Sequence, residues 1–155
     1  MSTYSARLLW SRPDDQAFTD RRYSRAHHLL FDGGVQLLGS SSPQVVPLPY
    51  SDAAGVDPEE LFVASLSSCH MLWFLDITCR AGWCVDRYED DAVGVMARDA
   101  QGRLAMTEVT LRPAVVFGGE HRPGAEVVAQ LHHQAHEACF IANSVRTAVN
   151  VVPQG

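Results

Sequence analysis

Two cysteines in different settings define the chemistry that this chain could do. Cys69 lies in an apolar stretch of helical character, where Ser65 and Ser68 leave space beside a thiol. Cys139 follows a second helical stretch, at a point where the backbone can move. A thiolate that attacks a peroxide becomes a sulfenic acid, and a second thiol can convert that acid into a disulfide. Such a pair is the minimum needed for thiol-based peroxide reduction, although each cysteine alone also suits an ordinary core position.

The other two cysteines and the nearest possible cation bear on whether Cys69 is reactive. A cysteine reacts as its thiolate, which a nearby cation stabilises. Within one helical turn of Cys69 only His70 could carry positive charge, so we expect an arginine from elsewhere in the fold. Cys79 and Cys84 have a four-residue gap between them, which is not the usual spacing of a zinc knuckle. We therefore expect these two cysteines to be structural.

Two other kinds of site fit the spacing of these residues. His132, His136 and Cys139 fall at positions i, i+4 and i+7, so one helical face could present three metal ligands in a non-catalytic binding protein. The sequence shows no obvious fourth ligand, and we expect no metal. Alternatively, the fold could serve hydrolysis through an acyl intermediate on Cys69, for which His70 is the only adjacent general base.

The elements that must position these residues follow an α+β order, β-β-β-α-β-β-α-β. Asp57 is a good N-cap, Pro58 a good first helical residue, and Gly82 a good helix stop. The helix between them is apolar nearly all round, which is typical of a buried central helix. We expect one domain over residues 1–155, with these parts: N-terminal strands in 3–38 with a hairpin turn at 32–34, the central helix over 57–81, strands over 85–98 and 104–117, a second helix over 123–138 and a final strand over 145–152.

Bulk composition excludes several classes of protein. The net charge is −6 and no basic stripe is present, so nucleic-acid binding is not expected. No apolar run reaches the roughly 18–20 residues of a membrane span, and the N-terminus lacks the apolar segment of a signal peptide. We therefore expect a cytoplasmic protein, in which static disulfides are rare.

Two motifs in this order resemble the OsmC/Ohr family of thiol peroxidases. The first is Asp57-Pro58-Glu59-x-Leu61-Phe62-x-Ala64 followed after five residues by Cys69, and the second is Ala138-Cys139-x3-Asn143-Ser144. The resemblance extends over essentially the whole chain. It implies an intertwined homodimer with two central helices wrapped by sheets from both chains. It also implies reduction of hydroperoxides, with organic ones preferred over hydrogen peroxide, by an external dithiol or thiol reductant and with no bound cofactor.

The resemblance also implies roles for individual residues. Cys69 would be the peroxidatic thiol, Cys139 the resolving thiol, and Glu59 the carboxylate that orients an arginine. The family's arginine corresponds to the segment 21–27, where Arg25 is favoured over Arg22. Phe140 follows Cys139 where a proline is common in the family, which indicates a divergent subgroup.

The substrate pocket and the arrangement of the site can also be anticipated. Apolar residues near the two cysteines would suit an alkyl or lipid tail. On one helix, Glu59 and Cys69 lie about 15 Å apart along the axis, at ~1.5 Å per residue. An arginine held by Glu59 would therefore act on Cys69 of the partner, across antiparallel helices at a two-fold axis. The predicted pocket residues are Phe62, Leu66, Trp73 and Phe140.

Overall fold

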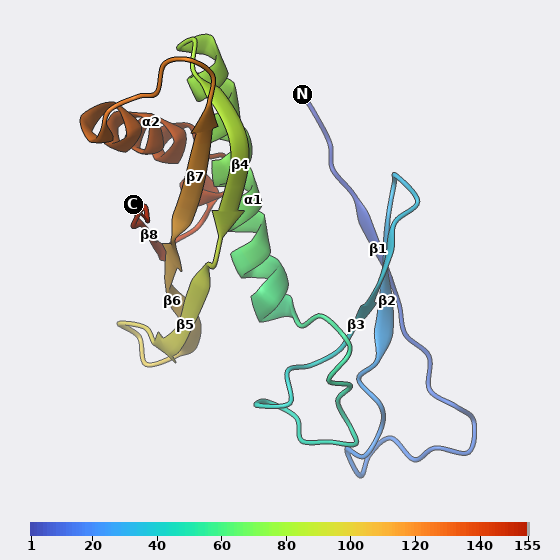
Figure 1. Ribbon diagram of the computed structural model, residues 1–155. Coiled ribbons are helices and arrows are strands. Elements are labelled where there is room, and N and C mark those ends of the chain that lie inside the picture. The colour runs from blue at the N-terminus through green and yellow to red at the C-terminus, as the bar shows by residue number, and fades with distance from the viewer. Residues whose placement is uncertain (155) are drawn as a thin grey trace. The chain divides into compact units, whose positions relative to one another are not determined.

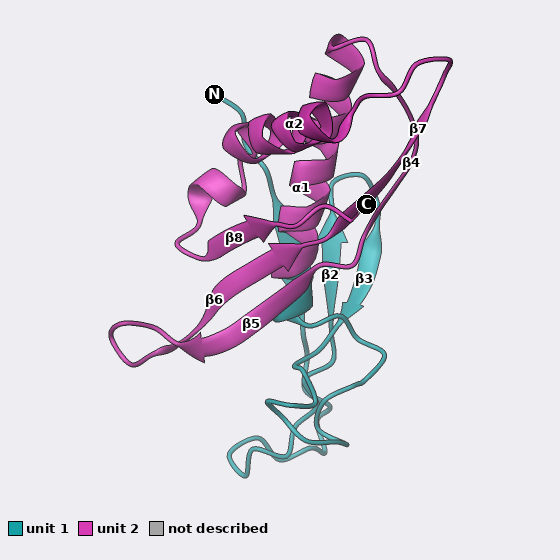
Figure 2. Ribbon diagram, turned by 60° about the vertical axis from the view of Figure 1, so that its left-hand side comes forward, with its two compact units in different colours: residues 1–61 teal, residues 62–155 magenta. Residues whose placement is uncertain are grey.

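The computed structural model describes residues 1–154 and divides the chain into two compact units, Met1–Leu61 and Phe62–Gly155 (Figure 2). The chain has the α+β order predicted from the sequence, with two α-helices and several small sheets (Figure 1). That the chain forms a single domain stays a prediction.

The N-terminal unit holds a three-stranded antiparallel sheet in the order β1-β2-β3. Its strands are β1 (Ala6–Leu9), β2 (His27–Phe31) and β3 (Gln36–Gly39). Gly34 takes a φ of 86° and donates its N–H to the carbonyl of Phe31 at 3.0 Å, which closes the turn between β2 and β3. The hairpin predicted at residues 32–34 is confirmed, whereas the first strand starts at Ala6, later than the predicted start of the strand region at residue 3.

Helix α1 (Pro58–Arg80) has the ends that its sequence predicts. Asp57 and Glu60 form a reciprocal capping box, in which the N–H of Glu60 donates to Asp57 Oδ1 at 2.7 Å and the N–H of Asp57 donates to Glu60 Oε2 at 3.0 Å. The helix ends before Gly82, whose φ of 84° an L-residue with a side chain rarely adopts. Both signals for the central helix are thus confirmed.

The environment of α1 differs from the sequence prediction. Its buried side chains form one stripe at four-residue spacing, whereas Leu72 on another face is 60% exposed. The prediction of a helix buried on all sides is therefore wrong for the single chain. The helix is also long and apolar enough to cross a membrane by length and composition, as core helices of soluble proteins are too. The prediction that no segment is long and apolar enough was wrong, because it required an unbroken apolar run. The helix meets the test on its mean hydropathy over 18 residues, which allows a few charged residues. The buried stripe comprises Leu66, His70, Phe74 and Thr78.

The C-terminal unit contains two sheets made by one long bent hairpin and the last strand. β4 (Cys84–Asp90) pairs antiparallel with β7 (Pro113–Gly118), and β5 (Val93–Arg98) pairs antiparallel with β6 (Leu104–Leu111). β8 (Ala148–Val151) adds to β6 in parallel. The sequence predicted one continuous strand for each arm of the hairpin, and each arm is instead divided between two sheets.

The division of the hairpin has a local cause at Asp90. Its Oδ1 accepts the backbone N–H of Arg112 at 2.6 Å, and its Oδ2 accepts the hydroxyl of Ser67 at 2.5 Å. These bonds tie the two arms to each other and to α1 at the point where both arms change sheet. A carboxylate that bonds two groups distant in sequence leaves no pattern of alternating residues from which to predict the break.

Helix α2 (Ala125–Ala138) starts after Gly124, two residues later than predicted, and the 3₁₀ turn η1 (Ala142–Ser144) connects it toward β8. α2 lies crosswise to α1 in both views (Figures 1 and 2). The core has two clusters that both include α1. One packs the helix against α2 and the other against β6; their buried members are Phe74, Leu131 and Ala135, and Leu66, Val109 and Leu111.

Candidate active site

Cys69 lines a cavity of about 630 Å³ on one face of α1. The thiol is half-buried, so a small molecule in the cavity can reach it. The helix supplies most of the wall, and the segment after α2 supplies Phe140 and Ile141. Ser65 and Ser68 line the same cavity, and these small residues leave room beside the thiol as their types predict.

The structure brings Cys69 and Cys139 together. The thiol of Cys69 lies close enough to raise the pKa of Cys139, and both cysteines are free thiols. Cys139 is only 1% exposed, in contrast to the half-buried Cys69. The pair therefore consists of one thiol open to a cavity and one thiol sealed behind it.

Burial controls the acidity of the sealed thiol. It raises the pKa of Cys139 to about 11, against a smaller lowering by the backbone N–H of Ala142, which donates to Sγ at 3.4 Å. Contact with Cys69 raises this pKa further. Cys139 thus stays protonated at neutral pH and is a poor nucleophile in this state.

The residues after Cys139 explain the spacing of the second motif. Asn143 donates its side-chain amide to the carbonyl of Glu137 at 2.9 Å, and Ser144 donates its hydroxyl to the carbonyl of Phe140 at 2.7 Å. The N–H of Asn143 also donates to the carbonyl of Cys139 at 3.0 Å. Together these bonds fold the backbone into a tight turn that keeps the thiol of Cys139 directed inward.

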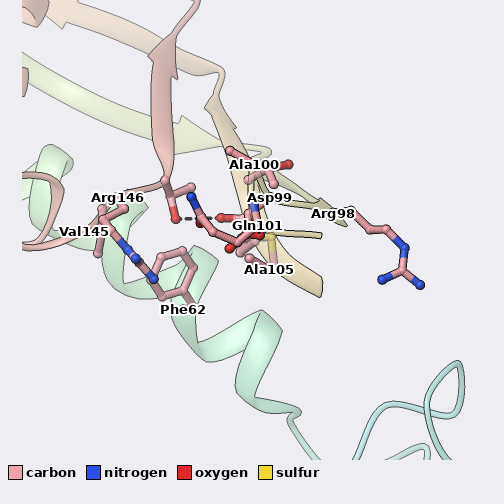
Figure 3. A pocket seen from close by; sticks show the side chains of 11 residues that line it. Phe62, Arg98, Asp99, Ala100, Gln101, Ala105, Val145 and Arg146 are labelled. Atoms are coloured by element: carbon pink, nitrogen blue, oxygen red, sulfur yellow. Dashed lines mark hydrogen bonds between the residues drawn. The ribbon is translucent and has the colours of Figure 1, made fainter. Parts of the chain in front are cut away.

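Only two of the four predicted pocket residues line the cavity of Cys69. Trp73 and Phe140 do so, with ring centroids 5.2 Å apart in an edge-to-face arrangement. Leu66 is fully buried in the core against β6. Phe62 lines a different cavity beside Val145 and Arg146 (Figure 3). Helical spacing does not explain the error, because residues three and seven positions before Cys69 fall on its side of the helix. In that part of α1 the core against β6 and the cavity beside Val145 take up these two side chains instead.

Sequence reasoning also missed residues that line this cavity. Leu72, Asp76 and Arg80 fall three, seven and eleven positions after Cys69 and line its cavity. Repeats of three and four residues mark one face of a helix. Spacing alone did not distinguish them, because Leu66 and Phe62 lie three and seven positions before Cys69 and line no part of its cavity.

The predicted arginine is held within its own segment. Arg25 donates Nη1 to the carbonyl of Arg21 at 2.8 Å and also to the carbonyl of Tyr23, and its guanidinium lies 3.8 Å from the centroid of the Tyr23 ring. Within residues 1–154 no ion pair joins Arg25 to Glu59. Arg22 is exposed, and its backbone N–H donates to Asp20. The catalytic role of Arg25 stays a prediction.

The two glutamates at the start of α1 have different surroundings. Glu60 completes the capping box with Asp57. Glu59 is half-buried, and no ion pair engages its carboxylate in the described part of the chain. Because Glu60 carries the structural role, the carboxylate of Glu59 remains available for another partner.

His70 follows Cys69 in sequence but is directed elsewhere. It is 1% exposed, and its Nε2 lies 3.1 Å from Nδ1 of His132, with the two rings stacked. Burial lowers the pKa of His70 to about 4 and that of His132 to about 4. His70 does not line the cavity of Cys69, which argues against its service as a general base for an acyl intermediate on that thiol.

The histidines do not assemble a metal site. Across residues 1–154, no group of three or more His, Cys, Asp or Glu side chains is placed to hold a metal ion. The three-ligand arrangement of His132, His136 and Cys139 allowed by their spacing is therefore not formed. Cys79 and Cys84 are exposed free thiols and line no part of the Cys69 cavity.

Comparisons with known proteins agree with this geometry. Residues 51–153 match the family model described as OsmC-like protein. The solved structure of an OsmC-like protein of unknown function from Vibrio cholerae is 51% identical, covers 99% of this chain and 100% of that one, and superposes with a TM-score of 0.97. No curated protein matches the chain.

More distant structures show the same fold. The organic hydroperoxide resistance protein OhrB of Bacillus subtilis is 20% identical over 99% of this chain and 98% of that one, with a TM-score of 0.66. An organic hydroperoxide resistance protein from Elizabethkingia anophelis, with thiocyanate bound, is 17% identical over 99% and 94%, with a TM-score of 0.70. From the family match and the Vibrio relative, the chain belongs to the OsmC/Ohr family of OsmC-like proteins.

Proposed function

We propose that this protein is a thiol-dependent peroxidase that reduces organic hydroperoxides to alcohols. The observation that carries the proposal is the contact between Cys69, open to a largely apolar cavity, and the sealed thiol of Cys139. Family membership adds support, since related folds include proteins named for organic hydroperoxide resistance.

The first step is attack on the peroxide. The Cys69 thiolate attacks the terminal oxygen of R–O–O–H, so that an S–O bond forms and the O–O bond breaks. The sulfur is oxidised to a sulfenic acid, and the departing alkoxide takes up a proton to become the alcohol. The apolar rings of Trp73 and Phe140 suit the organic part of such a substrate.

The second step uses the sealed thiol. Cys139 attacks the sulfur of the Cys69 sulfenic acid, an S–S bond forms, and the hydroxyl leaves as water with the thiol proton. Oxidation of Cys69 removes one group that raises the pKa of Cys139, which favours attack at this stage. An external dithiol then reduces the disulfide and is itself oxidised, so the scheme needs no bound cofactor.

The arginine and the carboxylate complete the proposed site. Arg25 would stabilise the thiolate and donate to the peroxide oxygens, with Glu59 orienting its guanidinium. Since Glu59 and Cys69 are about 15 Å apart along α1, the partner's copy of Glu59 would serve each thiol in a homodimer. The exposed side chains of Leu72 and Phe140 favour such a partner. We further propose a cytoplasmic location, where dithiol reductants are present.

The test is turnover of cumene hydroperoxide with a dithiol reductant. Purified wild type should consume the peroxide, and Cys69→Ser should reduce kcat/KM by roughly 100-fold or more, because serine is a far weaker nucleophile at neutral pH. Cys79→Ser is the matched control, since Cys79 lies on the same helix but is exposed away from the cavity. Equal activity of Cys69→Ser and wild type would refute the proposal.

A further inference from the structure

A second cavity, of about 620 Å³, lies in the C-terminal unit and shares no lining residue with the cavity of Cys69 (Figure 3). Its walls come from the turn between β5 and β6, the first residues of β6, the segment that leads into β8 and Phe62 of α1. The volume is in the range of pockets that bind small molecules. A ligand bound here would therefore occupy a site separate from the thiol pair.

The one carboxylate among the described residues that line this cavity is already engaged. Asp99 Oδ1 accepts the backbone N–H groups of Gln101 and Arg103, each at 2.9 Å. Its Oδ2 accepts Nε of Arg103 at 3.1 Å and Nη2 of the same guanidinium at 2.9 Å. The bond from the Arg103 backbone holds the pKa of Asp99 below its usual value, and the charge of Arg146 adds to this effect. Asp99 thus has no oxygen left for a cationic ligand.

The free polar groups of Gln101 and Arg146 are hydrogen-bond donors. Gln101 Oε1 accepts Nη2 of Arg103 at 3.0 Å, which leaves the side-chain NH₂ for a ligand. Arg146 is exposed, and among residues 1–154 no carboxylate forms an ion pair with it. Its guanidinium has five donors in a planar fork and no acceptor. A ligand that bonds to both side chains must therefore accept hydrogen bonds.

The cavity is positively charged, although the whole chain has a net charge of −6. Arg103 neutralises Asp99, so the charges of Arg98 and Arg146 are left without a counter-charge in the lining. Nη1 of Arg98 donates to the carbonyl of Gly102 at 2.6 Å, and the side chain extends away from Arg146 (Figure 3). Arg98 therefore contributes charge at the rim. Two cations favour a ligand with two negative charges over a ligand with one.

One wall of the cavity is apolar. Phe62, Met106 and Val145 line it, and all three are half-buried. An inorganic ion held by Arg146 would leave these side chains in contact with water. A ligand with an apolar body would cover them, and burial of apolar surface stabilises a complex.

We propose that this cavity is a binding site for a phosphate monoester with an aromatic or apolar body. The phosphoryl oxygens accept hydrogen bonds from the guanidinium fork of Arg146 and from the amide of Gln101, and the body lies against Phe62. A phosphate monoester carries a charge of about −1.5 to −2 at pH 7, which matches the two cations better than a carboxylate does.

The experiment is isothermal titration calorimetry of the whole protein with phenyl phosphate at low salt. Phenyl phosphate should bind more tightly than benzoate, which has one charge, and than inorganic phosphate, which has no ring. Arg146→Gln should weaken its binding by about tenfold or more, because a charge-assisted hydrogen bond is lost. Arg146→Lys should recover only part of this loss, since an ammonium group does not reproduce the planar fork. Added salt should weaken binding to wild type.

Arg122→Gln is the matched control. Arg122 is exposed in the same unit, forms no ion pair within residues 1–154 and does not line this cavity. The substitution changes the net charge as Arg146→Gln does, yet it should leave the affinity for phenyl phosphate within about twofold of wild type.

Three results would overturn the proposal. Equal losses in Arg146→Gln and Arg122→Gln would show that phenyl phosphate responds to net charge alone. Benzoate that binds as tightly as phenyl phosphate would exclude the phosphate class, and folded wild type that binds no phenyl phosphate would exclude the site. The titration contains no peroxide, so its result is independent of whether the protein is a peroxidase.

Discussion

Two pairs of side chains on different faces of one helix differ in their access to a ligand. Cys69 and His70 are consecutive residues of α1, about 100° apart around its axis. Cys69 meets Cys139 beside a cavity, whereas His70 meets His132 in the core. Each pair joins α1 to α2 or to the residue that ends it, and each consists of residues capable of chemistry.

Access to a ligand distinguishes the pairs. The thiol pair has one member open to a cavity of about 630 Å³. The histidine pair is almost fully buried, and within residues 1–154 neither Nδ1 of His70 nor Nε2 of His132 has a hydrogen-bond partner. Close contact between reactive groups thus does not by itself make a site. The histidine pair instead makes the fold sensitive to pH, since burial opposes protonation.

The strongest test of the thiol pair is removal of its sealed member. Without added reductant, one equivalent of hydroperoxide should consume two thiols in wild type, with a Cys69–Cys139 disulfide found by peptide mapping. Cys139→Ser should lose only one thiol and retain a sulfenic acid that dimedone traps on Cys69. A disulfide confined to Cys79 and Cys84 would show that contact between Cys69 and Cys139 does not determine the chemistry.

The histidine pair should affect the pH dependence of the unfolding free energy and leave peroxide turnover unchanged. Burial depresses both pKa values from 6.5 to about 4, so the unfolded chain binds protons that the folded chain refuses. The free energy of unfolding is therefore unaffected by these histidines above pH 6.5. It decreases as the pH falls from 6.5 toward 4, by at most about 3 kcal/mol per histidine. Urea unfolding at pH 7.5 and pH 5 measures this loss.

A double variant, His70→Phe with His132→Leu, provides the comparison. Its free energy of unfolding should fall less steeply as the pH is lowered. The charged groups that face His70 in wild type, His136 and Asp90, are kept in this variant. Its kcat/KM at pH 7.5 should stay within about twofold of wild type, because neither ring touches the Cys69 cavity. A folded double variant without peroxidase activity would place the histidines in the active site and remove the contrast between the two pairs.

The sequence predicted the helix ends and the two thiols because those signals are local. Asp57 and Gly82 act through their own backbone, and the two cysteine motifs have fixed spacings. The sequence could not assign the faces of α1. A helix that is apolar nearly all round has no amphipathic pattern to fix its rotation, so Leu66 was placed in the pocket while Leu72 was missed.

The break in the long hairpin was beyond sequence reasoning for a different reason. Asp90 bonds Arg112 and Ser67, which are more than twenty residues away on either side. Such tertiary hydrogen bonds override the local preference for a continuous strand. By contrast, the capping role of Glu60 was readable from its position three residues after Asp57, where a capping box places a glutamate.

Glu59 and Glu60, another pair of neighbours on α1, should also differ in what they do. Glu60→Gln removes a charge but can keep the capping geometry, so it should cost about 1 kcal/mol of stability or less and leave peroxidase activity unchanged. Glu59→Gln should leave stability nearly unchanged and lower kcat/KM by about tenfold, since the proposed active-site arginine would lose its charged partner. Urea unfolding and peroxide turnover on the same two preparations measure both effects.

Mixed dimers then show which subunit Glu59 serves. With Glu59 and Cys69 about 15 Å apart along one helix, the proposed site takes Cys69 from one protomer and Glu59 from its partner. A heterodimer of Cys69→Ser and Glu59→Gln subunits would have one intact site and one doubly altered site. It should therefore show about half the activity of a wild-type dimer, well above either parent. If subunit exchange is verified and the activity stays at the mean of the two parents, each site is built within a single chain, and Glu59 cannot act on the partner's thiol.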